Sequence, residues 1–177
     1  LELTRMNRNI RFLVPAANEK RKLQIEEMVV AHEGLLNVKV VLGQSKLVMQ
    51  AADVVLVNSG TATLEAMLLK KPFVMSYRLG SITYWLVSRL VRTPYFALPN
   101  ILAGRPLVEE LIQDAATPEA LALAVDRLID RDHAELMAAF DAIHRMLRCN
   151  GGAQAAQAIL AFIQSEKPVD ASTNVSS

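Results

Sequence analysis

The sequence has one cysteine, no long apolar run and no recognisable export signal. Cys149 alone cannot form an internal disulfide or an all-cysteine metal site, which favours a reducing, intracellular environment. No stretch approaches the roughly twenty consecutive apolar residues of a membrane-spanning helix. No basic start leads into an apolar stretch and a small-residue cleavage site. We therefore expect a cytoplasmic protein.

Acidic residues are missing from the middle of the chain. Overall the charges nearly cancel, with 19 Lys and Arg against 18 Asp and Glu, so nothing in the net charge suggests a nucleic-acid partner. Between Glu65 and Glu109, however, every charged residue is basic: Lys70, Lys71, Arg78, Arg89, Arg92 and Arg105. This stretch is expected to face an anionic partner.

The usual catalytic signatures are absent as well. There is no Walker-type phosphate loop and no Gly-x-Ser-x-Gly nucleophile elbow. The three histidines, His32, His133 and His144, are too far apart in sequence to have the spacing of a zinc site. No metal is therefore predicted.

The apolar content of 52% in 177 residues is enough for one sizeable core. Alternating patterns predict a parallel α/β sheet, in which the continuous apolar run 54–57 is a central strand covered on both faces. The predicted strands are 10–15, 38–42, 54–57 and 73–75, and the predicted helices of this half are 20–33, 45–51, 61–69 and 82–91. Ser45 is the expected cap of the second helix, and the expected core-facing residues of the first are Leu23, Ile25, Met28 and Val29.

After Pro99 the pattern predicts helices only, so the sheet is expected to be complete by that point. The predicted helices are 106–113, 118–131, 133–148 and 153–164. Residues 167–177 are small and polar, which is typical of a mobile tail. The predicted fold class is thus a Rossmann-like α/β domain over residues 1–166, with a helical C-terminal extension and a disordered tail.

The strongest local signal is Val57–Glu65, where a strand ends in a tight turn and a helix begins. The first amides of a helix point along a dipole that favours anions, so the backbone at Ser59, Gly60 and Thr61 can hold phosphate. Glu65, about one turn further on, can accept hydrogen bonds from two ribose hydroxyls. A nucleoside diphosphate fits this pattern. The alternative is an ordinary capped helix with a solvated glutamate.

Two further segments have open interpretations. In Leu98–Arg105, Arg105 can clamp phosphate, or the segment is an apolar loop in which Asn100 satisfies backbone groups. In Tyr77–Arg92, the mixture of aromatic and basic side chains suits a water–lipid boundary, with Tyr84, Trp85, Arg89 and Arg92 facing the lipid. The same pattern also fits a buried helix whose arginines extend to solvent.

Together these segments resemble the C-terminal half of lipid-A-disaccharide synthase, a glycosyltransferase with two Rossmann domains (GT-B). The resemblance covers roughly residues 10–163, and its motifs occur in the family's order. Those motifs are Ser-Gly-Thr-Ala-x-Leu-Glu at 59–65, Tyr-Arg at 77–78, Trp-Leu-x-x-Arg-Leu-Val at 85–91, Leu-Pro-Asn-x-Leu-Ala-Gly-Arg at 98–105, Arg-Cys-Asn at 148–150 and Gln-Ala-Ala-Gln-Ala at 154–158.

The resemblance implies that UDP-2,3-diacylglucosamine donates its sugar to 2,3-diacylglucosamine 1-phosphate, with inversion, at the inner membrane of a Gram-negative bacterium. Glu65 would take the ribose and the turn at Ser59–Thr61 the diphosphate. Tyr77 and Arg78 would lie on the donor, and Asn100 with Arg105 near the transferred sugar, where Asn100 is a possible assistant in catalysis. No metal or other cofactor would be required, because the helix dipole and nearby cations stabilise the departing UDP. A homodimer through the C-terminal helices is a further possibility.

Compared with the family, the sequence lacks an acceptor domain, which is expected to supply the general base. It also lacks the first strand of this half and the glycine-serine-arginine loop that follows. We therefore expect no transferase activity from these residues alone. Two alternatives remain at this stage: the corresponding half of another UDP-sugar glycosyltransferase or epimerase, and a non-catalytic module that binds a partner through its late helices.

Overall fold

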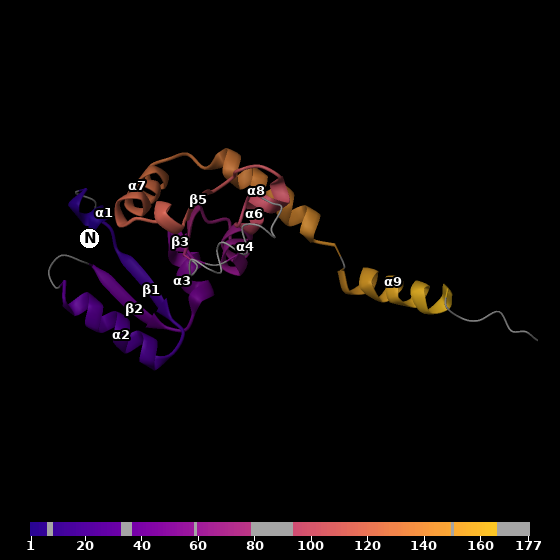
Figure 1. Ribbon diagram of the computed structural model, residues 1–177, viewed down its shortest axis with the longest axis horizontal. Coiled ribbons are helices and arrows are strands. Elements are labelled where there is room, and N and C mark those ends of the chain that lie inside the picture. The colour runs from indigo at the N-terminus through magenta and orange to yellow at the C-terminus, as the bar shows by residue number, and fades with distance from the viewer. Residues whose placement is uncertain (7–8, 33–36, 59, 79–93, 150, 166–177) are drawn as a thin grey trace, which may run out of the picture. The chain divides into compact units, whose positions relative to one another are not determined.

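The computed structural model describes residues 1–6, 9–32, 37–58, 60–78, 94–149 and 151–165 (Figure 1). The predicted helix 82–91 and the predicted tail lie outside these residues, as do Ser59, Tyr84, Trp85, Arg89 and Arg92. The chain divides into two compact units, residues 1–144 and 145–177. Each unit is described by itself.

The first unit is α/β, and every strand pair in it is parallel, as predicted. Its strands are β1 (Phe12–Ala16), β2 (Val38–Leu42), β3 (Val55–Val57), β4 (Phe73–Tyr77) and β5 (Glu109–Ile112). Its helices are α1 (Glu2–Arg5), α2 (Glu19–Val30), α3 (Ser45–Ala51), α4 (Gly60–Leu68), α6 (Leu98–Ala103), α7 (Pro118–Ile129) and α8 (Ala134–Leu147), with a 3-10 turn η1 (Gln113–Ala115). The boundary between the two units falls within α8, after His144.

The strands form two sheets where the sequence predicted one. One sheet is β1-β2 and the other is β3-β4-β5. Among the described residues, the run 54–57 has a strand partner on one side only, which corrects its prediction as a central strand, and Leu56 is 53% exposed. Continuous apolar character indicates a strand of this length, but it does not reveal whether the chain supplies a partner for each edge.

Strand β5 overturns the prediction that the sheet is complete before Pro99. Residues 106–113 contain this strand, which pairs with β4 from Val74↔Glu109 to Tyr77↔Ile112. Consecutive glutamates are unusual in strands, and Pro106 suggested the first turn of a helix. The structure explains the glutamates, since Glu109 and Glu110 bond partners on opposite faces of the sheet.

Most of segment 98–105 forms helix α6 (Leu98–Ala103), whereas the sequence suggested a loop or a phosphate clamp. Pro99 lies in its first turn, and Gly104 ends it in the left-handed region with φ of 65°. Both are standard helix boundary signals.

The N-terminal cap of α3 also differs from its prediction. Gln44, not Ser45, is the N-terminal cap residue of α3, without a side-chain cap bond.

Helix α2 packs less deeply than predicted. Asn18 caps it by accepting from the Arg21 N–H at 2.9 Å, but none of its residues is buried. Leu23 and Met28 are 58% and 62% exposed, so the prediction that both face the core is wrong. Among the described residues, too little of the chain lies over this helix to cover its apolar side.

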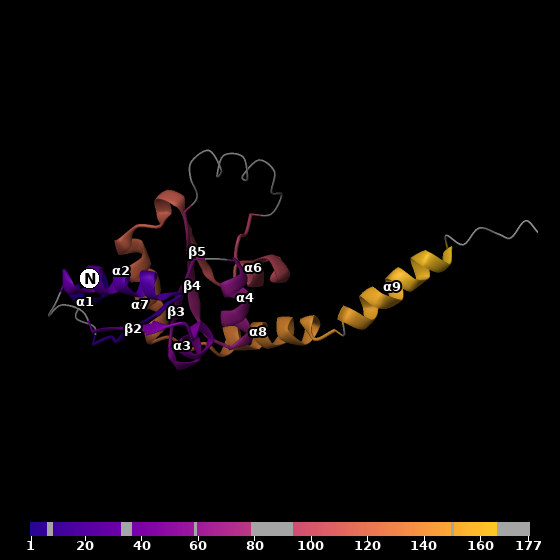
Figure 2. The same ribbon diagram turned by 90° about the horizontal axis from the view of Figure 1, so that it is seen from below.

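The core of the first unit lies around β3-β4-β5. Figure 2 shows α7 on one side of these strands and α4 with α6 on the other. Phe73 of β4 stacks on Phe140 of α8 with ring centroids 6.0 Å apart, and both are almost wholly buried. The second unit contains the predicted late helix as α9 (Gly151–Ser165), whose described side chains are exposed.

Candidate functional site

Three parallel strands bring several candidate residues to the same edge of the sheet. The carboxyl ends of β3, β4 and β5 are Val57, Tyr77 and Ile112, and β4 and β5 end in register. Ligands of open α/β sheets bind at this edge. The structure thus places the turn before α4 and the Tyr77-Arg78 pair at one edge, as expected for a shared site.

The first turn of α4 lies at this edge. Thr61 and Glu65 are exposed, and Gly60 is half-buried. Thr61 and Glu65 are four residues apart and therefore share one side of the helix. The carboxylate lies one turn beyond the helix start, where the sequence predicted it.

Gly60 lies close to the segment that leads into α6. A Cβ at residue 60 would meet the Phe96 carbonyl oxygen at 3.8 Å, an ordinary contact. Crowding within the fold therefore does not require glycine here. That glycine lets a ligand approach the backbone here stays a prediction.

Thr63 ties the start of α4 to the start of α6. Its wholly buried side chain donates a short hydrogen bond to the Gly60 carbonyl and accepts one from the Leu98 N–H at 3.1 Å. Sequence reasoning considered Ser59 and Thr61 as the polar residues of this turn and missed Thr63. The structural role of a buried threonine has no periodicity that could reveal it.

Glu110 of β5 accepts hydrogen bonds from two backbone amides of the segment that leads into α6. Its carboxylate accepts from the Phe96 and Ala97 N–H groups, each at 2.9 Å, and from Asn100 Nδ2 at 2.7 Å. This residue was also missed, because its segment was predicted to be helical. The N–H groups of residues 96, 97 and 98 are thus all accepted by side chains from other elements.

Asn100 is 1% exposed, and its amide is fully used within the fold. Oδ1 accepts from the Leu107 and Val108 N–H groups at 2.8 and 3.0 Å, while Nδ2 donates to the Val108 carbonyl at 2.9 Å and to Glu110. This arrangement matches the interpretation in which Asn100 satisfies backbone groups. Its part in donor binding or catalysis stays a prediction.

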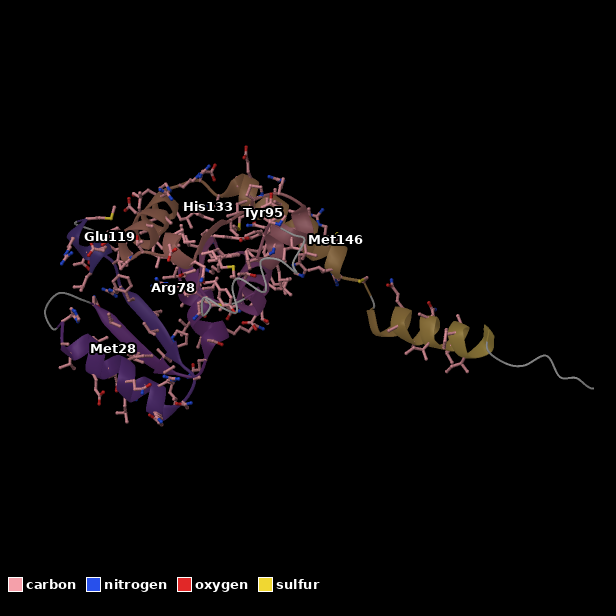
Figure 3. The ribbon with its side chains drawn as sticks, in the orientation of Figure 1. Met28, Arg78, Tyr95, Glu119, His133 and Met146 are labelled. Carbon is pink, nitrogen blue, oxygen red and sulfur yellow. The ribbon has the colours of Figure 1, made fainter. Side chains whose placement is uncertain are left out.

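Arg105 lies apart from the turn before α4. It lines a cavity of about 500 Å³ together with Arg131, Asp132 and His133. Because this cavity includes the approach to β5 and the end of α7, it lies toward the amino ends of the strands. Figure 3 labels His133, where α8 begins, and Arg78, which follows β4. The structure therefore does not bring Arg105 together with Glu65, and its role on the donor stays a prediction.

The comparison with known proteins decides the family. Residues 1–159 match the family described as Lipid-A-disaccharide synthetase. The chain belongs to this family. It is 49% identical over 154 residues to the Lipid-A-disaccharide synthase of Pseudomonas syringae pv. syringae (strain B728a). The matched residues make up 87% of this chain and 40% of that relative.

Other members of the Lipid-A-disaccharide synthetase family give the same picture. Identity is 49% over 155 residues with the protein of Pseudomonas aeruginosa (strain LESB58) and 48% over 155 residues with that of Pseudomonas putida (strain ATCC 700007 / DSM 6899 / JCM 31910 / BCRC 17059 / LMG 24140 / F1). Each match covers 88% of this chain and 40% of the relative. The chain thus spans about two fifths of the length of these family members.

The described residues hold neither a candidate metal cluster nor a candidate membrane-spanning helix. They contain no group of three or more His, Cys, Asp or Glu side chains able to hold a metal ion. Over the same residues, no helix combines the length and apolar character needed to cross a bilayer.

Proposed function

We propose that this chain is the nucleotide-sugar-binding part of a lipid-A-disaccharide synthase. It would hold UDP-2,3-diacylglucosamine while the sugar is transferred to 2,3-diacylglucosamine 1-phosphate, with inversion. The single observation that carries the proposal is the open amino end of α4 at the carboxyl edge of a parallel sheet, with Glu65 exposed one turn further on. Membership of a family whose relatives are named Lipid-A-disaccharide synthase supports a donor used in making a lipid A disaccharide.

In the proposed site the backbone at Gly60 and Thr61 receives the diphosphate. The first amides of α4 lack intrahelical acceptors, and the helix dipole favours the negative charge that grows on UDP as the glycosidic bond breaks. Arg78, exposed at the end of β4, supplies a cation at the same edge, and Tyr77 precedes it. This charge stabilisation needs no metal in principle.

Replacing Glu65 by alanine is expected to weaken UDP binding by about 1.5–3 kcal/mol, the usual contribution of hydrogen bonds to a charged acceptor. This corresponds to a Kd that rises roughly 10- to 150-fold. Isothermal titration calorimetry of UDP against the 177-residue chain measures it directly.

Glu119→Ala is the matched control, because Glu119 is an exposed glutamate in the first turn of another helix, α7 (Figure 3). This variant should bind UDP like the parent. Equal affinities for all three proteins would contradict the ribose role of Glu65. The absence of any UDP binding by the parent would contradict the proposed function.

We also propose that the 177 residues alone have no transferase activity. They correspond to 40% of the relative, and the acceptor site and general base would belong to the remainder. A coupled UDP-release assay with both acylated sugars should give no turnover above background. Turnover by the chain alone would show that the base lies among these residues.

The two separate sheets support the proposal that a further strand belongs to this domain. Both β1 and β3 are edge strands, and each has one side without a strand partner among the described residues. A parallel strand beside β1 or β3 would satisfy the backbone groups along that side of the strand.

The membrane and oligomer assignments remain proposals. Residues 84–92 would touch the inner-membrane surface through Tyr84, Trp85, Arg89 and Arg92, which suits acylated substrates. A homodimer would use the C-terminal helices, and the exposed apolar side chains of Ile159, Leu160 and Ile163 in α9 support a contact there.

A further inference from the structure

We propose that Glu110 is a positioning residue for the nucleotide site at the start of α4. The inference rests on the proposed function for the identity of the ligand. Its geometric part, that Glu110 sets the position of the α4 start at Gly60, does not depend on that ligand. Glu110 lies in β5 and would touch no substrate. It would act through the backbone of residues 96–98 and the side chain of Thr63.

Glu110 binds the backbone of residues 96 and 97 with both of its carboxylate oxygens. One carboxylate oxygen of Glu110 accepts from the Phe96 N–H and the other from the Ala97 N–H, both at 2.9 Å. Asn100 Nδ2 adds a third donor at 2.7 Å. Hydrogen bonds to a charged acceptor are roughly twice as strong as neutral ones, so this segment is held in one position.

The second step connects this grip to the helix start. The next amide along the chain, that of Leu98, bonds Thr63 Oγ1 at 3.1 Å, and Thr63 in turn donates to the Gly60 carbonyl. The Phe96 carbonyl also lies beside Gly60. A shift of residues 96–98 would therefore displace the first turn of α4, where the diphosphate is proposed to bind.

The third step is the contrast with the neighbouring glutamate. Glu109 binds Arg127 of α7 with both carboxylate oxygens at 2.7 Å, on the opposite face of the sheet and largely exposed. Among the described residues, the Glu109 carboxylate makes no hydrogen bond with α4 or α6. Two adjacent glutamates of one strand thus form a natural pair, of which one is connected to the site and the other is not.

The test compares Glu110→Gln with Glu109→Gln in the 177-residue chain. Glutamine keeps the shape but offers one acceptor and directs an NH₂ group at a backbone N–H. We expect the Glu110 variant to raise the Kd for UDP about tenfold or more, which is the effect of losing one such bond, and the Glu109 variant to change it less than twofold. Calorimetry is done well below the melting temperature of each protein.

A readout without ligand separates this inference from the proposed function. In ¹⁵N NMR spectra, the amide signals of Gly60 and Thr61 should shift in the Glu110 variant and stay unchanged in the Glu109 variant. If the parent does not bind UDP, the proposed function fails. The positioning role is then tested by the amide signals of Gly60 and Thr61 alone. Unshifted signals, or UDP affinity equal to the parent's, would overturn it.

A second variant covers the case in which Glu110→Gln does not fold. Thr63→Val keeps the side-chain shape and removes both hydrogen bonds of the hydroxyl, which breaks the same connection from the α4 side. It should produce the same shift at Gly60 and Thr61 and the same loss of UDP affinity. A folded Thr63→Val chain with parental spectra and affinity would equally overturn the inference.

Discussion

Replacing Asn100 by alanine is expected to lower the free energy of unfolding by at least about 3 kcal/mol. The substitution leaves three backbone groups without partners, namely the Leu107 and Val108 N–H groups and the Val108 carbonyl. Each buried polar group that loses its partner costs about 1–3 kcal/mol. Asn100 is 1% exposed, so water can replace the amide only if the local structure opens.

Thermal and urea unfolding of the 177-residue chain measure this effect. A loss of about 3 kcal/mol corresponds to a melting temperature about 6–12 °C lower in a domain of this size. Gln50→Ala is the control, because Gln50 is an exposed amide in α3 and its replacement should stay within about 0.5 kcal/mol of the parent.

The same variant separates the two interpretations of Asn100. If its amide serves the fold, the loss of stability precedes any loss of UDP binding, and calorimetry in the cold shows near-parental affinity wherever the chain is folded. A variant that melts like the parent but no longer binds UDP would instead place Asn100 in direct contact with the donor. The hydrogen bonds of the structure favour the first outcome.

The sequence predicted the strands and helices whose pattern is set locally. Strand β2 has its predicted bounds, and α7 begins at its predicted residue Pro118, with Thr117 accepting a hydrogen bond from the Ala120 N–H. β4 is two residues longer than predicted. Continuous apolar runs and N-terminal caps depend only on neighbouring residues, so a single sequence is enough to find them.

What the sequence could not predict depends on partners far along the chain. The residues of β5 look helical until Glu110 is seen to hold the amides before α6, fourteen residues upstream at Phe96. A charged side chain that is turned away from solvent is favourable only when such donors are present. Likewise, an apolar run does not show whether β3 has neighbours on both sides.

The candidate site was predictable in part for the same reason. The turn before α4 and the position of Glu65 follow from one local motif, and the structure leaves that helix end open. Arg105 was grouped with the site because its motif matches the family, yet it lines a cavity at the other edge of the sheet. A motif gives the order of residues along the chain, and only the fold gives their distances.

Replacing Phe140 by alanine tests whether α8 is an integral part of the first unit. Phe140 is wholly buried and stacks on Phe73 of β4 at 6.0 Å, so its replacement by alanine removes a large side chain from the centre of the core. We expect a loss of about 3–5 kcal/mol in the free energy of unfolding. The melting temperature should fall by about 6–20 °C.

Ile159→Ala in α9 is the comparison, since this side chain is 60% exposed and its loss leaves no cavity in the core. It should change the unfolding free energy by less than about 0.5 kcal/mol. If Phe140→Ala were as mild as Ile159→Ala, α8 would not be docked on the sheet in solution. Another part of the protein would then have to cover β4 on that face. The core beneath α4 would not be complete within these residues.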